Sequence, residues 1–187
     1  LLGATLLWQV GTRSREDKLL HLATSAVDFV LAHQSPNGRW AYGLQAHHKW
    51  TDNFHTGFIL ECLSVCQTQD MISQPDGHFQ KGLEYYEAHL FTPDGTPQYY
   101  DGSVFPLDAH VYAQAVITLL KCRPDHAMEG SLVRRVLAAA FRDLWHPSGY
   151  FRYQRRRFYR VRINYLRWSQ AWMFRALAAF LRAHPVE

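Results

Sequence analysis

Pro36-Asn37-Gly38, Pro93-Asp94-Gly95 and Pro147-Ser148-Gly149 are three copies of one Pro-x-Gly tripeptide, and each follows a stretch with helical apolar spacing. Their glycines lie 57 and then 54 residues apart. A proline does not continue a helix, and a glycine readily adopts the positive φ that reverses the chain. Self-similarity at a fixed period of this length indicates tandem copies of one supersecondary unit, so the sequence predicts a repeat protein.

Apolar residues recur at helical rather than alternating spacing between these tripeptides. Each repeat therefore reads as two helices joined by a short polar stretch, which is an αα-hairpin. The helices expected on this basis are Leu19–Gln34, Thr56–Cys66, Gln80–Leu90, Val111–Cys122, Leu132–Leu144 and Gln170–Arg182.

A small residue near the start of every other helix keeps the same period. Gly3, Gly57, Ala115 and Ala171 are separated by 54, 58 and 56 residues. A residue with little or no side chain lets neighbouring helices approach closely, and we expect it to do so here. The residue before it is Thr or Gln in the last three copies, and a polar side chain at that place must meet a partner or face a pocket.

The first Pro-x-Gly loop carries a recognisable motif. Gln34, Gly38 and Trp40 resemble the Gln-x-x-x-Gly-x-Trp motif of terpenoid-cyclase and prenyltransferase repeats, in which the Gln caps helix ends and stacks on the Trp. The resemblance implies an (α/α) toroid. The chain lacks the aspartate-rich motif of a diphosphate-binding cyclase and a zinc triad, so prenyl chemistry is only an alternative. The later copies depart from the motif at Phe91, Pro97, Trp145 and Phe151.

A second resemblance covers most of the chain. The segments 50–57, 82–86, 93–97 and 167–174 look like a bacterial toroid family whose members resemble six-hairpin glycosidases and sugar epimerases, and which is often associated with surface-polysaccharide production. This resemblance implies an all-α fold of tandem αα-hairpin repeats forming part of an (α/α) toroid. It also implies a protein that acts on or binds a poly- or oligosaccharide.

The length limits how much of a toroid is present. We expect one domain, 1–187, with repeats at about 3–56, 57–114 and 115–170 and then a final helix. A closed ring of six such hairpins needs ~340 residues, so we interpret the chain as the C-terminal part of a longer protein. An open arc exposes an apolar edge, and we expect the N-terminal remainder or a partner to cover it.

The cysteines and the hydropathy indicate a compartment. Cys62, Cys66 and Cys122 form no Cys-x-x-Cys motif, and buried free thiols in a reducing compartment are the simplest interpretation. No apolar run reaches the ~18 residues of a membrane span. Leu1–Val10 lacks the basic flank and the cleavage site of a signal peptide. We therefore expect a cytoplasmic protein without a membrane span.

Basic residues are concentrated near the C-terminus. The net charge is +4, and nine Arg but no acidic residue occur between Leu144 and Val186. Aromatic residues alternate with them at near-strand spacing, which predicts a short β-hairpin near 150–163 with its turn at 154–157. Three interpretations remain open: a solvated ribbon, an anion-binding wall for acidic sugars, or a surface for nucleic acid, which is the least favoured.

Polar and aromatic residues gather in the loops that lead into the helices beginning near 56, 111 and 170. Flat rings stack on the apolar face of a sugar, while amides and guanidinium groups bind its hydroxyl or acidic groups. The residues expected to bind the substrate are Trp40, Tyr42, Trp50, Asn53, Tyr100, Arg162, Tyr165, Arg167, Trp168 and Gln170.

Two acidic residues occupy similar places, each just before a histidine. Asp52 with His55, and Asp108 with His110, are the candidate catalytic groups. Two carboxyls could hydrolyse a glycoside, as acid and base or nucleophile. Alternatively, a His or Tyr could abstract a proton beside a carboxylate, as in an epimerase or lyase. Both aspartates are equally well placed as helix N-caps.

The remaining expectations concern ligands other than sugars. No HExxH or comparable spacing appears, so we expect no metal. No Gly-rich phosphate loop appears either, and we expect no cofactor. The carbohydrate is the expected partner. A non-catalytic repeat scaffold in polysaccharide biosynthesis is the alternative to an enzyme.

Overall fold

The computed structural model of the chain describes residues 1–69, 71, 76–123, 130–161 and 163–184. This part of the chain is mainly α-helical, with a small region of antiparallel strands. The α-helices are α1 (Leu2–Ser14), α2 (Asp17–Ala32), α3 (Asn53–Thr68), α4 (Asp76–His89), α5 (Ala109–Cys122), α6 (Leu132–Leu144) and α7 (Ala171–Ala183). Every helix expected from the apolar spacing is present, with ends a few residues from the expected ones.

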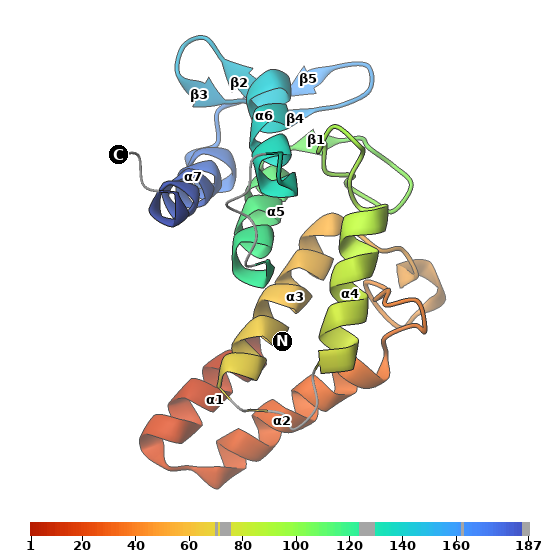
Figure 1. Cartoon of the computed structure of the whole chain (residues 1–187), viewed down its shortest axis with the longest axis vertical. Coiled ribbons are helices and arrows are strands. Elements are labelled where there is room, and N and C mark those ends of the chain that lie inside the picture. The colour runs from red at the N-terminus through yellow and green to blue at the C-terminus, as the bar shows by residue number, and fades with distance from the viewer. Residues whose placement is uncertain (70, 72–75, 124–129, 162, 185–187) are drawn as a thin grey trace.

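The helices pack in the order that the hairpin pattern predicts (Figure 1). The odd-numbered helices α1, α3, α5 and α7 form a row in which each contacts the next. Each of α2, α4 and α6 packs against the odd-numbered helix before it. The central helix α5 is buried along most of its length, because it contacts α3, α6 and α7. The described residues thus form three αα-hairpins and a final helix.

The Pro-x-Gly loops adopt the conformation that their glycines predict. Gly38, Gly95 and Gly149 have φ values of 90°, 86° and 88°. A Cβ at Gly38 would overlap the carbonyl oxygen of Lys81 in α4, and a Cβ at Gly95 would overlap Arg135 in α6. The loops after α2 and α4 therefore each rest on the next even-numbered helix, at a place that only glycine fits.

Side chains of the Gln-x-x-x-Gly-x-Trp motif fasten the first of these loops. Gln34 Nε2 donates to the carbonyl oxygens of Gly38 and His78, both at 2.9 Å. Trp40 Nε1 donates to the carbonyl oxygen of Val30 at 3.0 Å. These bonds join the end of α2, its loop and the first turn of α4.

The small residues in the odd-numbered helices do not all serve one purpose. A Cβ at Gly57 would lie 2.8 Å from Thr118 Oγ1 of α5, so this glycine permits the close approach of α3 and α5. A Cβ at Gly3 would meet no atom within 4 Å. The expectation of close approach is confirmed at Gly57 and is wrong at Gly3, which borders an open pocket shared with α3.

The strands form two small hairpins above α6 (Figure 1). Strand β2 (Trp145–His146) pairs with β3 (Tyr150–Phe151), and β4 (Gln154–Arg155) pairs with β5 (Arg160–Val161). Strand β1 (Leu107–Asp108) pairs with β4. The expected hairpin near 150–163 is present, but its turn lies at 156–159, not at 154–157. Gln154 belongs to the strand because its buried side chain binds Asp108.

The cysteines and the apolar character of the helices were also predicted from the sequence. Cys62, Cys66 and Cys122 are all buried free thiols. Burial raises the pKa of Cys62 to about 11 and that of Cys122 to about 12. Among the helices of the described part, none is both long enough and apolar enough to cross a bilayer.

Candidate functional site

The candidate site lies where α3 and α5 begin and where a π-helical turn (Leu166–Gln170) leads into α7. Asp52 is the N-cap of α3 and accepts the backbone N–H of His55 at 2.7 Å. Asp108 is the N-cap of α5 and accepts the backbone N–H of His110 at 2.9 Å. Both aspartates therefore satisfy the exposed N–H groups of a helix start, as one interpretation of the sequence predicts.

Asp52 also holds the ring of His55. The two carboxylate oxygens lie 3.0 and 2.8 Å from His55 Nδ1. The Asp52 side chain is only 6% exposed, whereas that of His55 is 49% exposed. When Nδ1–H donates a hydrogen bond to the carboxylate, Nε2 carries no proton and is a free acceptor. This is the arrangement of a histidine that acts as a base.

Asp108 lies in a more enclosed environment. Its Oδ2 accepts a hydrogen bond from Gln154 Nε2 at 2.8 Å, which ties the start of α5 to strand β4. Burial raises the pKa of this carboxyl above its ordinary value, and the hydrogen bonds from Gln154 and the His110 backbone oppose the rise. A carboxyl that holds its proton more firmly is suited to donate one.

His110 lies among aromatic rings from three helices. Its ring centroid is 4.2 Å from that of Phe54, 4.1 Å from that of Trp172 and 6.2 Å from that of Trp168. Burial is the main cause, and Arg175 and His55 smaller causes, of the lowering of the His110 pKa to about 4. The lowered pKa keeps the imidazole neutral, and its buried Nε2 has no hydrogen-bond partner among the described residues.

An aromatic platform adjoins the Asp52–His55 pair. The rings of Tyr42 and Trp50 are stacked with centroids 4.9 Å apart and planes 14° apart. Tyr42 also meets His55 edge-on at 4.7 Å, and His48 meets Trp50 edge-on at 5.3 Å. Both platform rings remain exposed to solvent.

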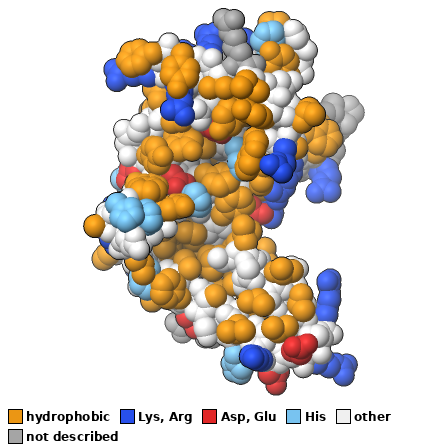
Figure 2. All heavy atoms as spheres, turned by 180° about the vertical axis from the view of Figure 1, so that it is seen from behind, with side chains coloured by type: hydrophobic (Ala, Val, Ile, Leu, Met, Phe, Trp, Pro, Cys, Tyr) orange, Lys and Arg blue, Asp and Glu red, His pale blue; other side chains and the backbone are white. Residues whose placement is uncertain are grey.

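A pocket of about 490 Å³ opens between the first turn of α1, the loop 40–42 and α3. Asp52, His55 and Tyr42 contribute polar groups to it, and the remaining lining is largely apolar. Figure 2 shows apolar side chains running along this face of the molecule, with histidine and acidic side chains among them. Such a mixture suits a ligand with both apolar and polar faces.

Three of the expected substrate-binding residues are engaged within the protein. Trp40 is buried, although its edge lines the pocket. Asn53 is buried, donates to the carbonyl oxygen of Leu90 at 2.8 Å and accepts from the hydroxyl of Tyr86 at 2.8 Å. Gln170 accepts the backbone N–H of Phe151 at 3.0 Å and donates to the same residue's carbonyl oxygen. These contacts fasten neighbouring segments together.

Four others lie at the surface around the helix starts. Arg167 lies over the ring of Trp168, 5.2 Å from its centroid. The Tyr165 ring meets Tyr153 edge-on at 5.0 Å. The backbone of Tyr100 pairs with that of Asp52, which brings its loop beside α3. Arg162 lies outside the described residues.

The sequence interpretation left out residues that the fold brings into the site. Phe54 and Trp172 enclose His110, as described above. Tyr99 is half-buried, and its backbone carbonyl oxygen accepts the N–H of Asn53 at 3.2 Å. Burial and the charge of Asp108 raise the pKa of Tyr99 to about 12. Phe54 lies three residues before Gly57 and Trp172 directly follows Ala171, so their positions beside the periodic small residues were the available signal.

Rings link the two Asp–His pairs into one site. Phe54 lies between them, with its centroid 5.2 Å from that of His55 and 4.2 Å from that of His110. Ring contacts therefore form an unbroken series from Trp50, which stacks on Tyr42, through His55 and Phe54 to His110. In the part of the chain that the structure describes, no group of three His, Cys, Asp or Glu side chains has the arrangement of a metal site.

Comparison of the chain with protein-family models, with curated proteins and with solved structures gave no match.

Proposed function

We propose that the protein acts on a carbohydrate, with the Asp52–His55 pair as its acid–base group and the Tyr42–Trp50 stack as its sugar platform. The observation that carries this proposal is the half-exposed His55 whose Nδ1 is held at 2.8 Å by a buried carboxylate beside the pocket. A histidine fixed in this way keeps Nε2 free toward a ligand. Exposed stacked rings next to it suit the apolar face of a sugar.

Proton abstraction is the chemistry that this arrangement favours. His55 Nε2 would take the proton from the carbon beside a uronate carboxylate, and the C–H electron pair would pass into that carboxylate as an enolate. Return of a proton to the carbon gives an epimer, whereas loss of the substituent on the next carbon gives an unsaturated sugar. Arg167, over Trp168, is a cation at the site that could bind the uronate.

Hydrolysis of a glycoside is the second reaction to test. Asp108, whose pKa is raised by burial, would be the acid, and Asp52 would be the base or nucleophile. Both carboxylates already accept hydrogen bonds from helix N–H groups, which favours the proton-abstraction alternative. A non-catalytic scaffold that binds a polysaccharide through the same aromatic rings is the alternative to any enzyme.

We also propose that the helical arc is part of an (α/α) toroid. Its two outermost odd-numbered helices expose apolar side chains, which are Leu2, Leu6 and Val10 on α1 and Phe174 and Leu181 on α7. The inner helices of a closed ring would bury such faces against the next unit. Further chain of the same protein, or a partner, would then complete the ring.

The proposal is tested with purified protein and neutral and uronate-containing oligosaccharides, followed by mass spectrometry in D₂O. We expect deuterium incorporation at a sugar carbon, or an unsaturated product, and at least a roughly hundredfold loss in His55→Gln. The matched control is His21→Gln, an exposed histidine of α2 away from the site. Gain of water would show a hydrolase instead of proton abstraction.

The scaffold alternative makes a different prediction in the same assay. Without turnover, binding should still weaken in Tyr42→Ala or Trp50→Ala and stay unchanged in His55→Gln. Absence of binding to every sugar would overturn the carbohydrate proposal itself.

A further inference from the structure

The β4–β5 hairpin combines exposed aromatic rings with guanidinium groups at its turn. Phe158 is 89% exposed and Tyr159 is 58% exposed. The guanidinium of Arg157 lies over the Phe158 ring at 5.6 Å, and that of Arg156 lies over the Tyr159 ring at 5.8 Å. The hairpin projects from the molecule beside α6 (Figure 1), and basic and apolar side chains are adjacent there at the upper left of Figure 2. Adjacent exposed rings at one tip form an apolar patch of the kind that marks an interaction site.

Carboxylates do not neutralise this end of the molecule. No Asp or Glu occurs between Leu144 and Val186. Among the described residues of the hairpin, Arg155 forms an ion pair with Asp143 at 3.8 Å, and the charge of Arg156 acts on Asp108. Neither Arg157 nor Arg160 has such a contact. The positive charge of the hairpin is therefore available to an anionic partner.

A small basic pocket adjoins the hairpin. It has a volume of about 330 Å³ and is lined by His146, Tyr150, Arg152 and Arg160. Arg152 also donates to the carbonyl oxygen of Trp145 at 2.7 Å, which fixes its position between the two hairpins. Two guanidinium groups facing one pocket suit the oxygens of a phosphate.

We propose that the β4–β5 hairpin docks the protein on an anionic lipid surface. Phe158 and Tyr159 enter the headgroup region, and Arg157 and Arg160 contact lipid phosphates. Exposed aromatic rings flanked by cations are what an anionic membrane interface attracts, through apolar burial and charge together. The hairpin uses none of the residues assigned to the carbohydrate site, so this inference stands or fails independently of it.

Two other anionic partners fit less well. Stacking on a nucleic acid base or on a sugar uses the flat face of a ring, and a guanidinium already covers one of the two faces of each of these rings. Insertion between lipid headgroups needs only exposed apolar volume and nearby positive charge. The arrangement therefore favours lipid, and nucleic acid becomes an outcome of the test.

The experiment is vesicle flotation of the full chain with phosphatidylcholine alone and with about 30 mol% phosphatidylglycerol added, in about 0.1 M NaCl. Binding is expected only with the anionic lipid, and it should fall steeply in about 0.5 M NaCl because salt screens the charges. Phe158→Ser should weaken binding roughly tenfold. Arg157→Gln and Arg160→Gln should each weaken it about fivefold.

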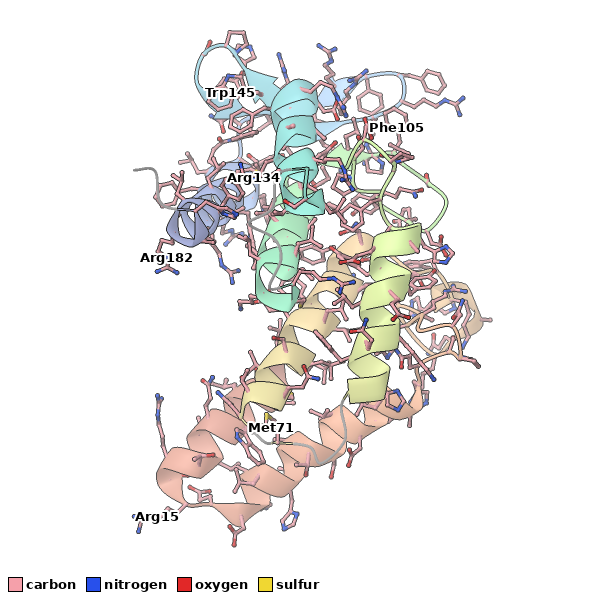
Figure 3. The ribbon with its side chains drawn as sticks, viewed as in Figure 1. Arg15, Met71, Phe105, Arg134, Trp145 and Arg182 are labelled. Atoms are coloured by element: carbon pink, nitrogen blue, oxygen red, sulfur yellow. The ribbon has the colours of Figure 1, made fainter. Side chains whose placement is uncertain are left out.

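Matched controls separate the hairpin from general surface effects. Phe174→Ser removes a ring that is 75% exposed on α7. Arg13→Gln removes a cation from the last turn of α1, and Figure 3 shows Arg15, just after this helix, at the opposite end of the molecule from Trp145 and the strands. Both should bind vesicles as the unchanged protein does. All five sites are exposed, and equal circular dichroism melting curves verify that the variants are folded.

Three results would overturn the proposal. The first is absence of binding to the anionic vesicles, and the second is an equal loss of binding in the control variants. The third is tight binding of a labelled polyuridylate by a protein that does not bind vesicles, with this RNA binding abolished in the hairpin variants. The last result would assign the hairpin to single-stranded RNA.

Discussion

Nδ1 of His55 lies 2.8 Å from Oδ2 of Asp52, and the same carboxylate accepts the backbone N–H of His55 at 2.7 Å. One buried carboxylate thus begins α3 and orients an exposed imidazole. A substitution of Asp52 therefore affects both the stability of the helix and the orientation of the ring. The two effects can be separated by the choice of replacement.

Asp52→Asn should keep the helix cap, since Asn caps helices about as well as Asp, and should change the free energy of unfolding by less than about 0.5 kcal/mol. Asp52→Ala should cost about 1–2 kcal/mol because the cap is lost. Both should impair turnover, since neither holds the His55 tautomer through a carboxylate. Urea unfolding and nitrogen NMR of the imidazole measure these effects. Equal stability of the two variants would contradict the cap assignment.

His110 should make the protein less stable in mild acid. The folded state lowers its pKa to about 4, whereas the unfolded chain protonates near the ordinary value of 6.5. Stability is therefore lost as pH falls from about 6.5 toward about 4. The loss in the free energy of unfolding that this partly exposed ring causes over that pH range should be about 1–2 kcal/mol once solvent screening is included.

The test of that pH dependence compares the unchanged protein with His110→Phe in urea at several pH values. The difference between the two proteins should shrink as pH falls, because the variant lacks this titration. The raised pKa of Asp108 makes the folded state more stable as pH falls, which is opposite to the effect of His110. Asp108 is present in both proteins, so its contribution cancels in the difference between their free energies of unfolding. A constant difference would mean that His110 is not held neutral.

Gly57→Ala should destabilise the protein, because a Cβ would lie 2.8 Å from Thr118 Oγ1 in the neighbouring helix. The expected cost is about 1–3 kcal/mol, as for other overpacked contacts. Gly3→Ala is the control, since its Cβ meets nothing within 4 Å and Ala favours the helix by about 0.5–1 kcal/mol. Thermal melting should therefore shift in opposite directions for the two variants.

Glu61→Ala should be among the more damaging single substitutions in the helical row. This buried carboxylate accepts hydrogen bonds from Gln114, at 3.0 Å, and from Lys121, and it lies 3.4 Å from Arg175. Its removal leaves the buried Gln114 amide without its acceptor across the helices, at a cost of about 3 kcal/mol. Glu84→Ala, on the exposed face of α4, should cost less than about 0.5 kcal/mol. Equal losses in urea unfolding would contradict this ranking.

The three thiols should resist alkylation in the folded protein. Burial raises the pKa of Cys62 to about 11 and that of Cys122 to about 12, so almost no thiolate exists at neutral pH. Intact-mass analysis after iodoacetamide should show no label natively and three labels in denaturant. Rapid native labelling would show that these side chains are accessible.

The helical pairing could be predicted because its signals are local. The 3.6-residue apolar period marks each helix, and Gly38, Gly95 and Gly149 mark the loops through the one conformation that glycine alone adopts easily. The N-cap roles of Asp52 and Asp108 could likewise be predicted from their position before an apolar helix. Whether the arc belongs to a closed ring remains a prediction.

The composition of the site could be predicted only in part, because its contacts join residues far apart in the chain. The bond from Gln154 to Asp108 and the enclosure of His110 by Trp172 depend on how α5, α7 and the strands pack. Nothing in the sequence indicated that the side-chain amides of Asn53 and Gln170 would form hydrogen bonds to backbone groups of Leu90 and Phe151. Tertiary packing therefore decides whether a given polar side chain binds the protein's own backbone or remains free to bind a ligand.

Gly38 at Lys81 and Gly95 at Arg135 are the same joint made twice, because each loop glycine meets the next even-numbered helix where a side chain does not fit. Such a joint allows the protein to gain or lose a whole unit of 54 to 57 residues while the other joints keep their geometry. A single inserted residue in one loop would instead redirect everything that follows it.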